Sequence, residues 1–247
     1  MSRRVIARLD VKNEFLIKGI QLEGLRKLGN TNDFARRYYG DGIDEILYMD
    51  AVASLYERNS LHGVVGATVQ DVFCPVCVGG GIRSAEDVRV MLRTGADKVS
   101  INTGAINTPS LIDEVAAKFG SQCMVLSVEA KRAGTGWECY VDNGREHTTL
   151  NVLDWVREAE SRGAGEILLT SVDNEGTKTG FDVELSGLVA EAVSVPVIAS
   201  GGAGSVDHVV DLFKQTRVSA VALAHILHYE LASVSEVRTA VAALGDL

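Results

Sequence analysis

Two carboxylates in the sequence have the types and positions needed for proton transfer. Asp10 and Glu129 each follow directly on a short apolar run. If both runs are strands of one closed barrel, the two carboxylates lie on opposite sides of its mouth, with the substrate between them. Carboxyl groups placed in this way are typical of general acid and base catalysis. The alternative is a structural role, in which Asp10 pairs with Lys12 and Glu129 pairs with Lys131 as salt bridges on the rim.

Two glycine-rich loops predict binding sites for phosphate. Residues 75–103, PVCVGGGIRSAEDVRVMLRTGADKVSINT, have the pattern of a strand, a tight loop, a helix and a second strand, and residues 196–224 repeat that pattern. Glycines let backbone N–H groups approach an anion, and helix N-termini add partial positive charge. Two such loops across one mouth suit an elongated small molecule with a phosphate at each end. The predicted phosphate- and substrate-binding residues are Lys18, Asp50, Gly81, Asn102, Thr103, Ser171, Gly176, Gly202, Ala224 and His225.

A second charged group is predicted at the opposite ends of the strands. Arg4, Glu45, Lys98 and Glu166 lie at the N-terminal ends of the first, second, fourth and sixth predicted strands. Two cations and two anions placed there could form a ring of ion pairs. Composition alone favours a structural role for them, because that face of a barrel usually serves stability.

The elements that must position these residues are strands alternating with helices. Apolar strands without strict alternation are typical of a parallel sheet covered on both faces. We therefore predict an α/β fold, a single (β/α)8 TIM barrel over residues 1–247. The predicted strands are residues 5–9, 45–50, 75–79, 98–101, 124–128, 166–170, 196–199 and 220–223. The predicted helices include residues 33–39, 60–71, 84–93, 110–119, 152–162, 183–192 and 234–244.

The repeat extends beyond the glycine loops. Residues 42–50 and 163–171 match with the same shift as the loops, and the Asp10 region matches the Glu129 region with nearly that shift. Because register and chemistry repeat together, the sequence indicates a twofold duplication, with half-barrels of approximately residues 1–120 and 121–247.

Two connections are longer than a barrel requires. Residues 11–32 exceed the 2 to 6 residues that such a connection usually takes, so they form either a mobile lid or an extra hairpin packed on the mouth. Residues 137–141 and 146–149 predict a second hairpin, with Asn143 and Gly144 in its turn.

Composition narrows the class of protein. The net charge of −9 argues against nucleic-acid or membrane-surface binding, and no apolar run or signal-type segment predicts a membrane span or export, so we expect a cytoplasmic protein. Cys74 and Cys77 form a CxxC motif, but a second motif for zinc is absent and the pair enters an apolar strand, so we interpret both as small core residues. The five histidines, including His225 and His228, lack metal-ligand spacing, and neither a metal nor a cofactor is expected.

Several motifs together resemble one family. RLDVK, DEILYMD, VGGGIRS, GADKVSINT, EAKR, GAGEILLTS, GTKTGFD and VIASGGAG, spread between residues 4 and 228, are similar to HisF, the cyclase subunit of imidazole glycerol phosphate synthase. The resemblance implies a duplicated barrel that binds a ribulosyl aminoimidazole carboxamide nucleotide by phosphates at both ends. It implies that ammonia closes the imidazole ring and that an aminoimidazole carboxamide ribonucleotide is released.

The resemblance also implies a partner. A glutaminase subunit of the HisH type would dock on the N-terminal barrel face, and ammonia would enter through Arg4, Glu45, Lys98 and Glu166, acting as a gate. The chain has no G-x-S-x-G nucleophile motif.

Four positions depart from the family pattern. Glu129 replaces an aspartate, Arg8 replaces a cysteine two residues before Asp10, Glu175 replaces an aspartate, and His225 replaces a serine. Catalytic geometry is sensitive to shifts of about 1 Å, and a guanidinium near the mouth could lower carboxylate pKa values.

Two functions are therefore compatible with the sequence. The first is a cyclase of histidine biosynthesis in which Asp10 and Glu129 act as acid and base. The second is a HisF-like subunit that conducts ammonia to an amidotransferase modifying surface sugars, which the Glu129 and Arg8 departures favour. The related sugar-phosphate isomerase barrel, which also uses two acidic strand ends, fits the motifs less well.

Overall fold

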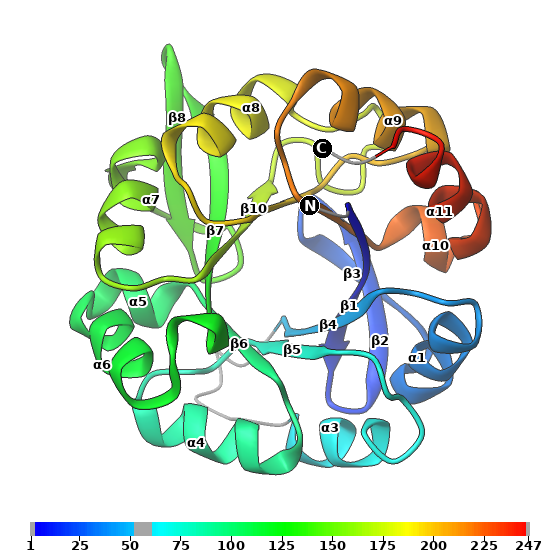
Figure 1. Cartoon of the computed structure of the whole chain (residues 1–247), viewed down its shortest axis with the longest axis horizontal. Helices are drawn as coiled ribbons and strands as arrows, with labels where there is room; N and C mark the ends of the chain where they lie inside the picture. The colour runs from blue at the N-terminus through cyan, green and yellow to red at the C-terminus, as the bar shows by residue number, and fades with distance from the viewer. Residues whose placement is uncertain (1–2, 52–60, 246–247) are drawn as a thin grey trace.

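The protein is a closed barrel of parallel strands in the computed structural model, which describes residues 3–51 and 61–245. Each strand pairs in parallel with the next, and the circle closes because β12 pairs with β1 and β10 pairs with β7 (Figure 1). This confirms the predicted (β/α)8 TIM barrel. In order around the barrel, the strands are β1 (Arg4–Lys12), β4 (Glu45–Asp50), β5 (Val76–Gly79), β6 (Lys98–Ile101), β7 (Met124–Ala133), β10 (Glu166–Ser171), β11 (Val197–Ser200) and β12 (Ala220–Leu223).

Helices surround the barrel and cover its outer face (Figure 1). They are α1 (Thr31–Gly40), α3 (His62–Thr68), α4 (Ala85–Thr94), α5 (Thr103–Asn107), α6 (Ser110–Phe119), α7 (Val152–Ser161), α8 (Val183–Ala192), α9 (Val206–Gln215), α10 (His225–His228) and α11 (Val234–Ala242), with a 3-10 turn, η1 (Ser121–Cys123). The main apolar core fills the space between these helices and the outward-facing strand residues. The predicted helix over residues 60–71 is shorter in the structure, and its first position lies outside the described residues.

Local sequence explains where equivalent helices begin. Ser84 caps α4 by accepting a hydrogen bond from the Asp87 amide, and Ser205 caps α9 by accepting one from the His208 amide. A serine side chain at this position satisfies an amide that has no partner within the helix. The two caps lie at equivalent positions of the sequence repeat, and each helix follows a glycine loop. The duplication itself remains a prediction.

The barrel interior has its own apolar layer, because alternate residues of each strand point inward. This interior layer consists of Ile6, Leu47, Cys77, Val125, Leu168, Ile198, Ala220 and Ala222. It separates the charged residues at the N-terminal ends of the strands from the polar residues at their C-terminal ends.

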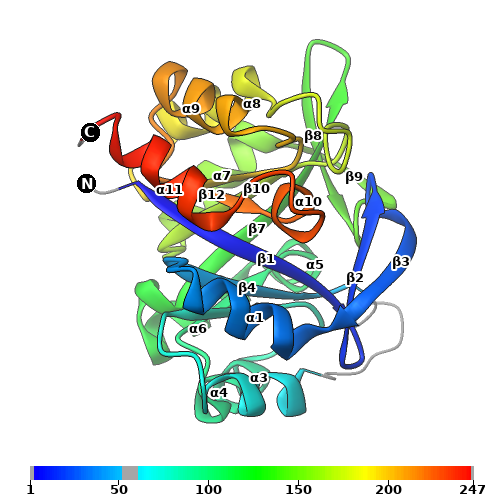
Figure 2. The ribbon, with the colours of Figure 1, turned by 90° about the vertical axis from the view of Figure 1, so that its right-hand side faces the viewer.

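Two hairpins extend from the C-terminal end of the barrel (Figure 2). β2 (Phe15–Ile20) and β3 (Glu23–Asn30) follow β1, and β8 (Gly136–Val141) and β9 (Glu146–Asn151) follow β7. Residues 11–32 thus take the hairpin form that was one of the two alternatives. The second hairpin is confirmed, with Asn143 and Gly144 in its turn at φ values of 61° and 73°. Both hairpins lie at the mouth, where the predicted substrate site is located.

Candidate active site at the barrel mouth

The two predicted acid–base carboxylates lie on opposite sides of the barrel mouth. Asp10 is near the C-terminal end of β1 and Glu129 near that of β7, strands that are four positions apart in the closed order. Both side chains are buried. They are therefore shielded from bulk solvent, and they lie close enough for the Asp10 charge to raise the pKa of Glu129.

Asp10 is held by two cations. Its Oδ1 accepts a hydrogen bond of 2.9 Å from Nε of Arg8, and its Oδ2 lies 3.6 Å from Nζ of Lys18. Burial alone would raise the pKa of Asp10, but the charges of Arg8 and Lys18 outweigh burial and hold that pKa below its usual value. Asp10 is therefore ionised at neutral pH.

Glu129 has a different environment. Its Oε2 accepts a hydrogen bond of 2.7 Å from the backbone N–H of Gly144, in the turn between β8 and β9. Among the described residues Glu129 forms no ion pair. Burial raises the pKa of Glu129 to about 7, and the Gly144 amide and the more distant Arg8 charge only partly offset it. The pair can thus present one ionised and one protonated carboxyl group near neutrality.

The salt bridges proposed as the structural alternative are not formed in the part of the chain that the structure describes. Asp10 pairs with Arg8 and Lys18 instead of Lys12. The Lys131 amine lies over the ring of Tyr140, 4.5 Å from its centroid. The carboxylates therefore point into the mouth.

A cavity of about 360 Å³ opens beside Glu129. It brings together residues from the ends of β4, β5, β6 and β7. Those of the predicted set that line it are Asp50, Gly81, Asn102, Thr103 and Glu129. The first glycine loop, the end of β6 and one acid–base carboxylate therefore share one space, as the sequence predicted for one half of the substrate site.

The glycine loop of this cavity needs glycine for steric reasons. Gly80 and Gly81 have φ values of 99° and 72°, which L side chains rarely adopt. A Cβ atom at Gly80 would lie 2.6 Å from the carbonyl oxygen of Asp50. Asn102 and Thr103 are fixed from above, because Asn102 donates to the Tyr140 carbonyl at 3.0 Å and the Thr103 hydroxyl accepts from the Asp142 amide at 3.1 Å.

The loop after β10, which contains Gly176, is covered by the β2–β3 hairpin. Gly176 lies so close to the hairpin that a Cβ atom there would be 2.8 Å from the carbonyl oxygen of Gly19. The Gln21 amide also donates to the Glu175 carbonyl at 2.8 Å. The hairpin thus packs directly on the loop after β10, where the second phosphate site is predicted.

The remaining residues of that predicted site belong to three strand ends. Gly202 follows β11, and a Cβ atom there would be 1.9 Å from the Gly180 carbonyl oxygen. Ala224 and His225 follow β12, and His225 packs against the Tyr229 ring. Ser171 ends β10 and hydrogen-bonds to Asn174 at 3.1 Å. These residues do not line the cavity beside Glu129.

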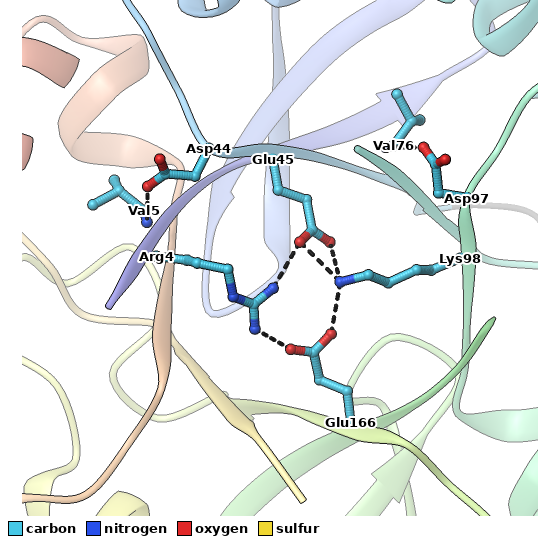
Figure 3. Close-up of polar contacts among 8 residues, drawn as sticks. All are labelled: Arg4, Val5, Asp44, Glu45, Val76, Asp97, Lys98 and Glu166. Atoms are coloured by element: carbon cyan, nitrogen blue, oxygen red, sulfur yellow. Dashed lines mark hydrogen bonds and ion pairs between the residues drawn. The ribbon is translucent and has the colours of Figure 1, made fainter. Parts of the chain in front are cut away.

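The charged group at the N-terminal end of the barrel forms a closed ring (Figure 3). Arg4 pairs with Glu45 at 2.8 Å and also with Glu166, and Lys98 pairs with Glu45 and Glu166 at 2.9 Å each. Burial alone would lower the pKa values of Arg4 and Lys98, but the two glutamates outweigh it and raise them. Burial raises the pKa of Glu45 against the nearby cations. The predicted ring is thus present, and it closes the lower end of the interior.

Several residues of the mouth were not predicted from the sequence. Arg83 lines the cavity beside Glu129, directly after the glycine loop. Thr170 and Ser200 face the interior and contact Arg8. A basic residue next to a glycine loop, and small hydroxyl residues at inward-facing positions of apolar strands, are signals that could have identified them.

The structure also bears on metal binding, on the cysteines and on membrane-spanning helices. Among residues 3–51 and 61–245, no cluster of histidine, cysteine, aspartate and glutamate side chains could hold a metal ion. Cys74 and Cys77 are free thiols, and burial raises the pKa of Cys77 well above its ordinary value, which fits a core residue. Within the same residues, no helix is long and apolar enough to cross a membrane.

Comparison with known proteins identifies close relatives of this chain. A family model described as Histidine biosynthesis protein matches residues 4–233. The chain is 58% identical over 205 residues to "Imidazole glycerol phosphate synthase subunit HisF" of Legionella pneumophila, covering 83% of this chain and 97% of that protein. It is 46% identical to the subunit of the same name from Myxococcus xanthus, covering 96% of this chain and 94% of the relative, and 45% identical to that from Streptococcus sanguinis, covering 99% and 98%.

Proposed function

The chain belongs to the HisF family, the cyclase subunits of imidazole glycerol phosphate synthase, and from that membership we propose that Asp10 and Glu129 are its catalytic base and acid. The protein is thus a lyase of histidine biosynthesis. Its substrate is a ribulosyl aminoimidazole carboxamide nucleotide with two phosphates. With ammonia, this yields imidazole glycerol phosphate and an aminoimidazole carboxamide ribonucleotide.

One observation carries this assignment. The two carboxyl groups lie on opposite sides of the mouth, and their pKa values are shifted in opposite directions. Two cations hold Asp10, whereas no cation of the described residues pairs with the buried Glu129. Adding ammonia to a carbonyl carbon and expelling water requires protons to be removed on one side and delivered on the other. An ionised Asp10 suits removal, and a protonated Glu129 with a pKa of about 7 suits delivery near neutral pH.

The two glycine loops support the binding of a substrate with two phosphates. One phosphate would bind at Gly81, Asn102 and Thr103, where Arg83 brings a guanidinium to the same cavity. The other would bind where three strand ends meet, at Gly176 after β10, Gly202 after β11, and Ala224 and His225 after β12. Between these two sites the substrate would span the mouth, with its reacting centre near Asp10 and Glu129.

The source of ammonia is proposed to be a glutaminase subunit of the HisH type docked on the N-terminal face. The ring of Arg4, Glu45, Lys98 and Glu166 lies at that face (Figure 3), and the apolar interior layer lies above it. Neutral ammonia would pass the ring and then this apolar layer. In this proposal the ring is a gate, and the layer excludes ions because burying an unpaired charge is costly.

The test is cyclisation by the purified chain with excess ammonium and no partner. Wild-type protein should turn over, Asp10→Asn and Glu129→Gln should each lose about 10²- to 10⁴-fold in kcat, and Glu129→Asp should retain measurable activity. Glu114→Gln, which removes an exposed carboxylate paired with Lys118 on α6, is the matched control and should leave kcat unchanged. Full turnover by Asp10→Asn would overturn the assignment of the base.

The same assay addresses the alternative, a barrel that only conducts ammonia to another enzyme. Such a barrel requires the ring but has no need of the carboxylate pair. The presence of both the pair and the glycine-loop cavity supports the cyclase. Failure of wild-type protein to cyclise the nucleotide, with recovery in Glu129→Asp, would instead support the conduit.

A further inference from the structure

Arg8 crosses the interior of the barrel just below Asp10. It lies on β1, and its Nη1 donates to the hydroxyl of Thr170 on β10 at 2.9 Å and to that of Ser200 on β11 at 3.2 Å. These strands are three and two positions from β1 in the barrel order. The side chain is 2% exposed. Its guanidinium therefore extends across the lumen and is held there by residues from other strands.

Placing a guanidinium in this position is costly unless its donors are satisfied. Burying a charge carries a penalty of several kcal/mol, which only good pairing geometry offsets. Arg8 meets this requirement with Nε on Asp10 and Nη1 on two hydroxyls. Because the guanidinium of an arginine is planar, the directions of its N–H groups are fixed relative to one another. The amine of a lysine has no such fixed geometry. The hydroxyls thus determine the direction in which Nε meets Asp10.

The charges around the mouth show what Arg8 does to the two carboxylates. Asp10 is faced by Arg8, by Lys18 of β2 and by His228 of α10. Glu175, in the loop after β10, acts on Arg8 and Lys18. Burial and the Lys18 charge lower the pKa of His228 to about 3, so the His228 imidazole is neutral at physiological pH. Lys18 also pairs with Glu175. The two cations, Arg8 and Lys18, therefore neutralise the two carboxylates Asp10 and Glu175.

Within residues 3–51 and 61–245, Glu129 is the carboxylate of the mouth that has no cation of its own. It is faced by Arg8 at longer range, by Asp10 and by Asp142 of the β8–β9 turn. Both aspartates repel a negative charge on Glu129. Because Arg8 is directed to Asp10 by Thr170 and Ser200, it stabilises one carboxylate much more than the other.

We propose that Arg8 is a positioning residue that, anchored on Thr170 and Ser200, holds Asp10 ionised and oriented and leaves Glu129 to carry the proton. This role rests on the proposed cyclase function, since it divides the acid and base tasks between those carboxylates. In this role Arg8 affects the reaction only through Asp10, and it does not contact the substrate.

The first test reads Asp10 directly in the ligand-free chain, so that it does not depend on cyclase activity. The carboxyl carbon of Asp10 would be titrated by ¹³C NMR, with Asp10→Asn identifying the signal. In wild-type protein the signal should stay in its ionised form from pH 8 down to about pH 5. In Arg8→Met the pKa of Asp10 should rise by about one to three units. Lys131→Met, which removes a cation two residues after Glu129, is the matched control and should not change it.

The second test reads the reaction. Cyclisation would be driven by ammonium, with the concentration of neutral ammonia held constant at each pH. Arg8→Met should lower kcat by at least about tenfold and change KM little. It should also move the acid limb of the pH–rate profile to higher pH. Arg8→Lys keeps the charge but loses the planar guanidinium. Compared with Arg8→Met, it should therefore restore the ionisation of Asp10 more than it restores kcat. If Arg8→Met does not fold, the comparison of wild type with Arg8→Lys decides the question by the same two readouts.

The outcomes separate the two proposals. An Asp10 pKa that is the same in wild type and in a folded Arg8→Met variant would overturn the role of Arg8, whatever the activity. Activity as high in Arg8→Lys as in wild type would also overturn it, because the planar guanidinium would then not matter. Absence of cyclisation in wild type, together with a raised Asp10 pKa in Arg8→Met, would refute the cyclase assignment while supporting the electrostatic role of Arg8.

Discussion

Lys18 on β2 and Glu175 in the loop after β10 form a buried ion pair that joins the β2–β3 hairpin to that loop. Lys18 also lies 3.6 Å from Asp10, so one amine connects the hairpin, the loop and a carboxylate of the mouth. The hairpin is thereby coupled to the proposed active site. A lysine expected to bind phosphate is instead engaged with two carboxylates in this structure.

The buried pair should matter for stability. Lys18→Met leaves two carboxylates without this cation, and removing one partner of a buried pair typically costs about 3 to 5 kcal/mol. We expect a loss of about that size in the free energy of unfolding measured with urea. Arg36→Met breaks an exposed pair with Asp71 and should cost less than about 1 kcal/mol. Equal losses for the two variants would contradict a buried, unscreened pair.

Glu129 should make stability depend on pH. Its pKa is raised from 4.5 to about 7 in the folded chain, so the folded state keeps its proton where the unfolded state has lost it. This contribution is fully present below pH 4.5 and is lost as pH rises through about 7, a difference of about 3 kcal/mol. Chemical unfolding of wild type and Glu129→Gln at a series of pH values measures it.

The free energies of unfolding of wild type and Glu129→Gln should differ most in their pH dependence between pH 4.5 and about pH 7. Wild type should lose stability relative to Glu129→Gln as pH rises through this range. Asp10 provides the contrast of opposite sign, because its lowered pKa stabilises the fold above its usual pKa and that contribution is lost on acidification. Parallel curves for wild type and Glu129→Gln would show that Glu129 is not protonated in the folded state.

The charged ring should affect ammonia delivery more than chemistry. Lys98→Met removes the cation that links Glu45 to Glu166, whereas the mouth is separated from it by the interior layer. With the glutaminase partner we expect glutamine-dependent cyclisation to fall by at least about tenfold, while ammonium-driven cyclisation changes less than about twofold. Lys118→Met, on the outer helix α6, serves as the control. Equal losses with both nitrogen sources would point to a structural role for the ring.

Gly202 should not tolerate a side chain. Its φ value is 103°, and a Cβ atom would lie 1.9 Å from the Gly180 carbonyl oxygen, so Gly202→Ala must displace the second glycine loop. A displacement of about 1 Å near the substrate can cost about 10²-fold in kcat/KM. Gly63→Ala is the matched control, since a Cβ atom at Gly63 would meet no atom of the described residues within 4 Å. Unchanged kinetics in Gly202→Ala would argue against phosphate binding at this loop.

Much of this architecture could be predicted from the sequence. The alternation of apolar runs and helical segments predicted the barrel, and the strand-end positions of Asp10 and Glu129 predicted a pair facing across its mouth. The ring could be predicted because Arg4 and Lys98 begin strands whose first residues share one end of the barrel. These inferences depend on strand order and direction, which local sequence patterns encode.

The tertiary structure alone decided which charges meet. Arg8 reaches Thr170 and Ser200, and Lys18 reaches Glu175, across separations of 162, 192 and 157 residues in the chain. Such contacts depend on the register of barrel closure and on how the β2–β3 hairpin folds back, and no local pattern specifies either. The sequence therefore determined that two carboxylates share the mouth, while the folded structure determined which one is ionised. The physical reason is that proton affinity depends on burial and on the distance to the nearest charges, which exist only once the chain has closed.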